Sequence, residues 1–425
     1  MNAVSKRSVI GLAVVFAMSI TFLFAEKAMA VPAFAKQQGA ECTLCHVGFP
    51  KLNETGIKFR INGYRMDGDV GENIWEQDLK NHIGVVAGTN YVNKDMEMPM
   101  PPMEDAGAGD GGAEHRESAQ SDMNGTMKVK TSQLEMAPAL IYFAGTLAPR
   151  ISYFTHLVAS SSSTVLALSN FSILDVAPDA ALNIRAGVTN VDLPYLSSSR
   201  RLTMSDYLVQ LSGGAAGHGG GGHGGAGLNS CTNCGVSMTK AGADVNGLVS
   251  MGDNMSLEYV LGLGNNGVGE TEQKVDSIYG YATLNIGGQS IGFIFNNDKA
   301  GDNENVEQDV TAYGISGDFN FADFNIMATY NILTQAQAGG DDVETSSGAL
   351  EGSWTILENI IGVVRYDFSD IADSDVAENQ IIASFLYYLN PNVRLQAELA
   401  SNTATDHSGT DRSSTGIYGG ATIGF

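Results

Sequence analysis

Long apolar runs are almost absent from this sequence. Only residues 9–24 are nearly all apolar, and after residue 30 no stretch approaches the roughly 18 to 20 apolar residues that a transmembrane helix needs. Charged residues are also scarce, at 16% of the chain, whereas 43% of the residues are hydrophobic and glycine occurs 51 times. The sequence therefore argues against an α-helical membrane protein and favours many short strands with one apolar face.

Basic residues are in short supply as well. Lys and Arg number 23 against 47 Asp and Glu, which gives a net charge of -24 at pH 7. Nucleic acid is a poor partner for a surface of this sign, because its phosphates would be repelled. Acidic stretches such as residues 302–309 could concentrate cations near the protein, but an ordinary solvated surface explains the same charge. Acidity alone therefore does not identify a ligand.

The first thirty residues have the pattern of an export signal. Lys6 and Arg7 precede the apolar run, and Ala-Met-Ala at residues 28–30 forms a small-x-small cleavage site. We predict that residues 1–30 are a signal peptide. A retained membrane anchor is the alternative, which the short apolar run and the cleavage site disfavour. The mature protein is therefore expected in the cell envelope.

Several later segments alternate between apolar and polar residues, as the strands of a membrane barrel do. The alternation is clear at residues 278–286, 364–368 and 393–399. The chain ends in residues 417–425, an alternating stretch that closes on Phe425. A closing strand with a terminal aromatic residue resembles the C-terminal signal of bacterial outer-membrane barrels.

The connections between these segments are alternately short and long. Tight turns are expected at residues 147–150, 252–254, 287–289 and 389–392, and longer polar loops at 302–309, 339–348, 369–379 and 405–414. Counting from residue 79 gives about 16 strands, an even number that returns both ends to the periplasm. We therefore predict an all-β fold, a porin-like outer-membrane barrel over residues 79–425. A soluble β-sandwich would explain the alternation but not the terminal aromatic strand.

Cysteine is rare too, and two of the four form a motif. Cys42, Cys45 and His46 make a C-x-x-C-H, the attachment pattern of a c-type haem. The thiols can form thioethers to the haem, and the imidazole of His46 can serve as the proximal iron ligand. A disulfide or zinc pair beside an unrelated histidine is the alternative. We predict one covalent haem c and a role in electron transfer.

Residues 31–78 are too few to enclose a haem alone, because a small domain buries little of its own surface. Another surface must shield the porphyrin, and the nearest is the inside of the barrel that follows. We therefore expect residues 31–78 to form a monohaem cytochrome c-like plug in the barrel lumen.

The residues around the motif carry a resemblance to a known family. Residues 31–39 read VPAFAKQQG, residues 42–46 read CTLCH, and residues 49–64 read FPKLNETGIKFRINGY. These segments resemble the fused cytochrome-porin family of outer-membrane iron oxidases, and over the rest of the chain the likeness is one of architecture. The resemblance implies a monohaem cytochrome joined to a porin, which takes electrons from extracellular Fe(II) and passes them to a periplasmic carrier such as a soluble cytochrome. The resemblance supports the role of electron conduit more strongly than it supports Fe(II) as the electron donor.

The sixth ligand of the iron is left open. Met66 would give a His/Met iron of higher potential, whereas His82 would give a bis-His iron of lower potential. His82 is expected at the start of the first strand, where alternation with Ile83 and Val85 turns it into the lumen. A surface methionine and a structural lumen histidine are the alternatives for these two residues. Two further possibilities are an iron without a sixth protein ligand and a methionine ligand from a later cluster.

That later cluster contains four methionines among prolines and acidic residues, and thioethers bind Cu(I). A flexible acidic loop is the preferred interpretation, because composition alone is weak support for a site. The cluster consists of Met96, Met98, Met100 and Met103.

Two other stretches of the sequence resemble known motifs. Cys231 and Cys234 are not followed by histidine, which excludes a second c-type haem; a disulfide between them is favoured over a metal site shared with His218 and His223. Residues 262–267 match G-x-G-x-x-G, but they leave a strand for an acidic loop and another strand rather than a helix. Dinucleotide binding is therefore rejected.

The sequence thus predicts an electron conduit across the outer membrane, in contact with outer-membrane lipid. Fe(II) or another extracellular reductant is the expected donor, and with Fe(II) the chain would act as an iron oxidase. The alternative, from another class of protein, is a diffusion or metal-uptake porin whose haem domain senses or gates.

Overall fold

The computed structural model describes residues 33–99, 120–121, 126–160, 163–193, 195–197, 200–211, 238–265, 275–301, 307–336, 340–405 and 410–424. The expected signal peptide, Met100, Met103 and the segment that contains Cys231 and Cys234 lie outside these residues. None of the described helices is long and apolar enough to span a membrane.

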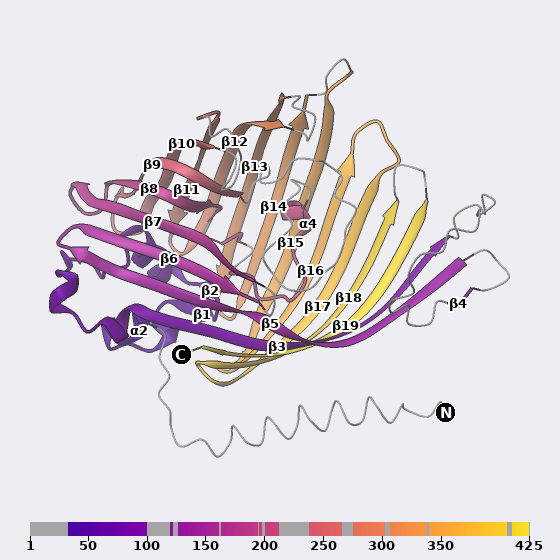
Figure 1. The fold of residues 1–425 in the computed structure, drawn as a ribbon, viewed down its shortest axis with the longest axis horizontal. Helices are drawn as coiled ribbons and strands as arrows, with labels where there is room; N and C mark the ends of the chain where they lie inside the picture. Colours follow the sequence, from indigo (N-terminus) through magenta and orange to yellow (C-terminus); the bar gives the residue numbers. More distant parts are fainter. Residues whose placement is uncertain are drawn as a thin grey trace.

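Sixteen antiparallel strands in the described chain close into one barrel (Figure 1). Each strand pairs with the next along the chain, and β19 pairs with β3 to close the ring; a two-residue strand β4 (Gln120–Ser121) also pairs with β5. The predicted all-β barrel of about 16 strands is confirmed. The strands are β3 (Ile83–Pro99), β5 (Thr126–Ala148), β6 (Ile151–Ala159), β7 (Thr164–Ala177), β8 (Leu182–Val191), β9 (Met238–Ser250), β10 (Met255–Asn265), β11 (Ser277–Ile286), β12 (Gln289–Gly301), β13 (Glu307–Phe321), β14 (Phe324–Gln335), β15 (Val343–Leu357), β16 (Ile360–Ile371), β17 (Ala377–Asn390), β18 (Val393–Thr405) and β19 (Asp411–Gly424).

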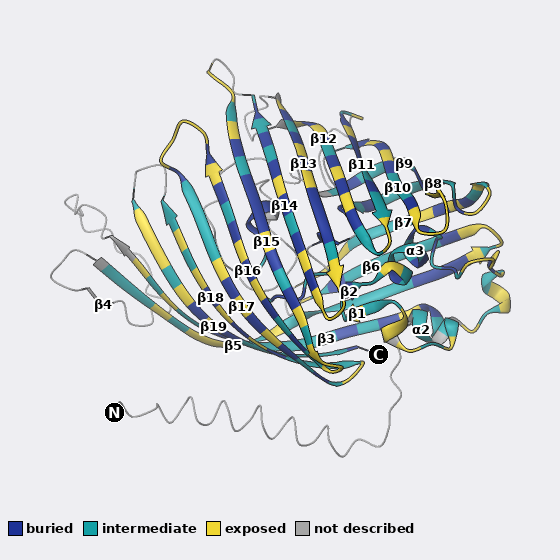
Figure 2. Ribbon diagram, turned by 180° about the vertical axis from the view of Figure 1, so that it is seen from behind, coloured by how far each residue is buried: buried dark blue, intermediate teal, exposed yellow. Residues whose placement is uncertain are grey.

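Alternation along each strand separates the two faces of the wall. On β16, Val364 is 63% exposed on the outside, whereas Arg365 and Asp367 are fully buried inside. Buried and exposed residues alternate in the same way along neighbouring strands (Figure 2). Successive side chains of a strand point to opposite faces, so an apolar residue at every second position gives the barrel its lipid-facing surface.

Short turns join the strands at one end of the barrel, as predicted. Gly287 and Gly288 both have positive φ, at 55° and 81°, and connect β11 to β12 in two residues, which suits the twist of a hairpin. At the other end the connections are longer, although each of the four polar loops named above is shorter than expected, since β13 already begins at Glu307 and β19 at Asp411. Strand β15 already begins at Val343 and β17 at Ala377, because the polar residues there continue the strand pairing.

The methionine cluster is not confined to a loop, contrary to the expectation. Met96 and Met98 belong to β3, which continues to Pro99 because β5 pairs with it as far as Thr126. Strands β3 and β5 have 17 and 23 residues, well beyond the roughly 9 to 11 that a strand needs to cross a membrane.

The described residues 33–82, called here the N-terminal segment, lie at the short-turn end of the barrel (Figure 1), and residues 49 and 51 contact its inner wall. The side chain of Lys51 donates to Asn325 Oδ1 of the inner wall at 2.6 Å, and Tyr388 donates to the carbonyl oxygen of Phe49 at 2.9 Å. The elements of this segment are α2 (Ala33–Gln38), η1 (Cys42–Leu44), β1 (His46–Gly48), β2 (Lys51–Leu52), α3 (Glu54–Ile61), η2 (Ile74–Glu76) and η3 (Leu79–His82).

Aromatic stacking joins the N-terminal segment to the wall on one side. The rings of Phe34 and Tyr64 stack at 4.7 Å, and Tyr64 stacks in turn on Phe154 of β6 at 5.3 Å. Phe59 of α3 meets Phe34 edge to face at 5.3 Å. Such pairs add to the free energy of burial, so α2 and α3 are held together and against β6.

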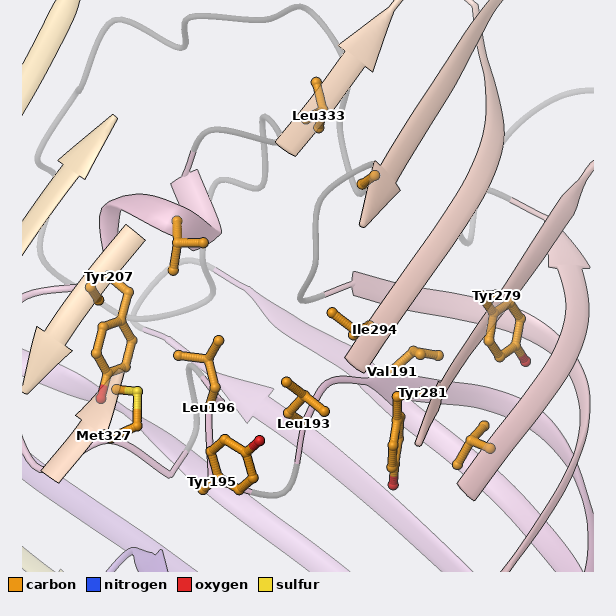
Figure 3. Packing of buried hydrophobic residues seen from close by; sticks show 14 of the residues in the cluster. Val191, Leu193, Tyr195, Leu196, Tyr207, Tyr279, Tyr281, Ile294, Met327 and Leu333 are labelled. Atoms are coloured by element: carbon orange, nitrogen blue, oxygen red, sulfur yellow. The ribbon is translucent and has the colours of Figure 1, made fainter. Parts of the chain in front are cut away.

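A second stretch, residues 192–211 between β8 and β9, also folds into the lumen and is called here the inner segment. It contains the short helix α4 (Leu208–Leu211) and residues that are almost fully buried, among them Leu193, Leu196 and Leu202. Figure 3 shows Leu193, Tyr195, Leu196 and Tyr207 of this segment among buried side chains of the wall. Tyr195 donates to the carbonyl oxygen of Ser316 on β13 at 3.0 Å, so the segment reaches across from β8.

Candidate functional site: a C-x-x-C-H turn inside the barrel

The C-x-x-C-H motif forms a compact turn ahead of α3. Cys42 opens η1, Cys45 follows it, and His46 begins β1. Asn53 holds this turn, since its side-chain amide donates to the carbonyl oxygens of Thr43 and Leu44 at 3.3 and 3.0 Å. The same side chain caps α3 through its oxygen, which accepts from the backbone N–H of Gly56 at 3.0 Å. Asn53 therefore links the motif to the helix.

Gly56 makes room for the motif. A Cβ atom at this position would collide with the carbonyl oxygen of Cys45, which itself accepts from the backbone N–H of Asn53 at 3.0 Å. We expect Gly56→Ala to displace the turn and to lower stability by about 1 to 3 kcal/mol, the usual penalty of overpacking. Thermal denaturation followed by circular dichroism measures it. Gly352→Ala, which places its methyl group in open space, is the matched control and should change little.

The imidazole of His46 is oriented as a metal ligand would be. Its Nδ1 lies 3.2 Å from the carbonyl oxygen of Pro50, a partner to which only a protonated Nδ1 can donate. This bond selects the tautomer that leaves Nε2 with a free lone pair, as in most metal-binding histidines. Burial lowers the pKa of His46 to about 4, against the opposing effect of the backbone at Pro50 and Lys51. The ring is therefore neutral near pH 7, as ligation requires.

Cys45 carries a free thiol in this structure, and burial raises its pKa. A thiol that is partly accessible next to an oriented imidazole suits thioether formation with a porphyrin vinyl group. The chemistry of the described residues therefore fits a haem c, for which Cys45 would be one attachment point and His46 Nε2 would be the iron-binding atom.

Phe49 connects the motif to the barrel wall. Its ring lies 5.3 Å from that of His46 and packs against an apolar cluster. Its carbonyl oxygen accepts from Tyr388 and, at 3.2 Å, from Nη1 of Arg394. The cluster comprises Leu202, Ile361, Val363, Leu386 and Tyr388. Because Leu202 belongs to the inner segment, the two inserts meet beside the motif.

Met66 and His82 lie elsewhere in the N-terminal segment. Met66 is partly buried and follows Arg65, which pairs with Asp175 of β7 at 2.9 Å. His82 is 2% exposed, and its ring stacks on Tyr153 of β6. His82 packs against β5 and β6, and the backbone carbonyl of Met66 accepts from Asn62 and Asp69 of the N-terminal segment itself. His46, in contrast, reaches β16 to β18 through Phe49. The structure thus does not bring either residue into contact with His46.

His82 is the last residue of η3 and precedes the first strand instead of opening it. Its Nδ1 lies 3.1 Å from the hydroxyl of Tyr153, and Gly145 leaves space for the ring, since a Cβ there would collide with it. Burial lowers its pKa, and its Nε2 has no hydrogen-bond partner among the described residues.

Ion pairs fix the N-terminal segment to the inner wall. Arg60 of α3 lies 3.4 Å from Glu258 and 3.3 Å from the hydroxyl of Tyr281, which donates to the same carboxylate at 2.6 Å. Lys51 lies 3.8 Å from Asp318 and 3.9 Å from Glu351. Buried charges of this kind are stable only when paired, so each holds the segment in one position.

Polar groups on β16 and β18 hold the inner segment against the wall by hydrogen bonds. The Glu398 carboxylate accepts from the backbone N–H groups of Met204 and Ser205, at 2.6 and 2.8 Å. Arg365 donates to the carbonyl oxygens of Ser205 and Asp206 at 3.0 and 2.8 Å. These hydrogen bonds are not predicted from the sequence, in which the only signal for them is the presence of charged residues at inward positions of the two strands.

The remaining motifs contribute no site in the described chain. No group of three or more potential metal-ligating His, Cys, Asp or Glu residues occurs there. The G-x-G-x-x-G match starts in β10, and β10 pairs antiparallel with β11, so two strands flank it as expected. His218 and His223 lie outside the described residues.

Comparison with known proteins identifies the fold class. No family model and no curated protein matches the chain. Among solved structures it is similar to an anion-selective porin from Comamonas acidovorans, with a TM-score of 0.52 and 13% identity over 81% of this chain and 98% of that one. It is also similar to the outer-membrane channel DcaP of Acinetobacter baumannii, with a TM-score of 0.50 and 12% identity over 81% and 98% of the two chains. The fold is that of a 16-stranded porin-like outer-membrane barrel, and at this identity the likeness extends to the fold alone.

Proposed function

We propose that this barrel is an electron conduit of the bacterial outer membrane, with one haem c attached at Cys42 and Cys45 and His46 as its proximal ligand. The observation that carries the proposal is the C-x-x-C-H turn inside the lumen, with His46 Nδ1 engaged by Pro50 and Nε2 left free. A haem held there would supply a one-electron Fe(III)/Fe(II) couple. The second axial ligand stays open between Met66, His82, a methionine of the later cluster and no protein ligand.

The surroundings of the motif suit electron transfer better than the passage of solutes. The N-terminal segment and the inner segment meet at Phe49 and Leu202, and both are fastened to the wall by buried polar bonds. Two inserts in contact narrow the water-filled path beside the motif. An electron can cross packed side chains, whereas a hydrated solute cannot.

The ends of the barrel set the direction of the proposed transfer. In outer-membrane barrels the short turns face the periplasm and the long loops face outward. The N-terminal segment lies at the short-turn end, which would bring the haem towards a periplasmic carrier such as a soluble cytochrome. The expected donor is extracellular Fe(II), and each Fe(II) oxidised would deliver one electron to that carrier.

A diffusion or metal-uptake porin with a haem-bearing sensing or gating segment is the second candidate. The comparisons, taken alone, favour it over the conduit, because both similar structures are described as a porin or a channel. In that case the N-terminal segment would regulate the pore.

Proteoliposomes distinguish the two functions. Vesicles that carry the full-length protein are loaded with ferric cytochrome c, and Fe(II) is added outside under anaerobic conditions. A conduit reduces the trapped cytochrome without iron entry and without swelling in sugar solutions. If the vesicles swell and the cytochrome is reduced only when iron enters, the protein is a porin. Empty vesicles and vesicles with His46→Ala protein are the controls.

A further inference from the structure

Arg394 is unusual among the arginines of the barrel interior. It is the second residue of β18, and its Nη1 donates to the carbonyl oxygen of Phe49 at 3.2 Å. Its Nε is buried and has no hydrogen-bond partner in the described chain, where Arg394 also forms no ion pair. Its side chain also hydrogen-bonds that of Tyr388, and the charged groups near it are Arg201, which pairs with Asp206, and Glu398, whose oxygens accept from the inner segment.

The other interior arginines each have a carboxylate partner. The pairs are Arg60 with Glu258, Arg65 with Asp175, Arg185 with Asp244, Arg200 with Asp192, Arg201 with Asp206, and Arg365 with Asp367. A buried charge without a partner is strongly unfavourable, and a guanidinium has five donors arranged to meet an oxyanion. Arg394 differs from these six arginines, because in the described chain it forms no ion pair and its half-buried guanidinium keeps a buried Nε that could donate to a further oxyanion.

The position of Arg394 indicates where that anion would come from. Phe49 touches both groups, since its carbonyl oxygen accepts from Arg394 and its ring lies 5.3 Å from that of His46. A porphyrin of the haem type carries two carboxylates on its edge. A haem attached at the C-x-x-C-H turn would therefore bring an oxyanion into the neighbourhood of Arg394.

We infer that Arg394 is a binding residue for a haem propionate, through a charge-assisted hydrogen bond from its guanidinium. The inference rests on the proposed haem site and adds to it a residue more than 340 positions away in the chain. The same guanidinium chemistry would also accept a free oxyanion from solution, such as phosphate.

The redox potential is the first test. The ferric iron carries one more positive charge than the ferrous iron, so removing a nearby cation favours the ferric state. At the midpoint potential of the wild type, Arg394→Gln should raise the ratio of ferric to ferrous haem about tenfold, which equals a fall of about 59 mV for one electron. Arg394→Lys, which keeps the charge, should recover most of the shift.

Arg185→Gln is the matched control, because Arg185 already pairs with Asp244 on the neighbouring strand β9. It should leave the midpoint unchanged. Equal midpoints for the wild type and Arg394→Gln, with haem covalently bound in both, would overturn the inference and leave the proposed function intact. Absence of covalent haem in the wild type would instead remove the proposed function, and the inference with it.

Thermal stability provides a second test, because Arg394→Met should shift the unfolding temperature in opposite directions with and without haem. In haem-loaded protein, Arg394→Met should lower the unfolding temperature, because it leaves the propionate without its partner. In the haem-free Cys42→Ala, Cys45→Ala protein the same change should raise it, because it removes a half-buried charge that has no ion pair in the described chain. The same sign in both backgrounds would contradict the proposal. A haem-loaded protein in which Arg394→Met changes the unfolding temperature only after phosphate is added would also contradict the proposal, since the anion would then come from solution.

Discussion

A Cys42→Ala, Cys45→Ala double variant should contain no covalent haem, whereas the barrel should still insert. Thioether attachment requires the thiols, and in the described chain the thiol of Cys45 forms no disulfide that the fold would lose. Denaturing gels stained for haem peroxidase measure attachment, and the heat-dependent mobility of the barrel measures folding. Oxidation of external Fe(II) by the reconstituted variant should fall to the level of empty vesicles.

A Cys231→Ala, Cys234→Ala variant is the matched control. It removes the same number of thiols from a pair that no histidine follows, so its stain should equal that of the wild type. A wild-type band that never stains would exclude the cytochrome and leave only the porin. A stain that survives the loss of Cys42 and Cys45 would place the haem elsewhere.

The barrel could be predicted from the sequence because each strand and each turn is specified by its own short stretch of residues. A strand exposed to lipid on one face must alternate residue by residue, and a two-residue turn requires residues such as Gly287 and Gly288. Each signal is contained in about ten residues, so the strands at 278–286 and 393–399 appear in the structure where they were expected. The C-x-x-C-H motif is local for the same reason.

The contents of the lumen could not be predicted, because they depend on residues far apart in the chain. The inner segment reads as an ordinary polar connection between β8 and β9. Its burial follows from Arg365 and Glu398, which lie 160 and 193 positions after Ser205. The expectation that Met96 and Met98 lie in a loop was wrong for a related reason, since pairing with β5, and at Met96 with β19 as well, extends β3 through these residues.

Of the single changes in the lumen, Arg365→Ala should lower the stability of the protein most. Arg365 is fully buried and lies 4.0 Å from the ring centre of Tyr207, donates to Thr203, and pairs with Asp367 at 2.9 Å. Its removal leaves the carboxylates of Asp367 and Glu351 without this cation, and breaking a buried pair costs about 3 to 5 kcal/mol. The inner segment would also lose four of its hydrogen bonds and cation contacts to β16.

Detachment of the inner segment should widen the path through the barrel. Single-channel recordings in planar bilayers should therefore show a higher conductance for Arg365→Ala than for the wild type, together with a lower unfolding temperature. Arg185→Ala separates the two effects, because Arg185 pairs with Asp244 within the wall and does not hold the inner segment. It should lower stability without raising conductance. An unchanged conductance in Arg365→Ala, despite a clear loss of stability, would mean that the inner segment does not control the opening, because the N-terminal segment alone would then close the lumen.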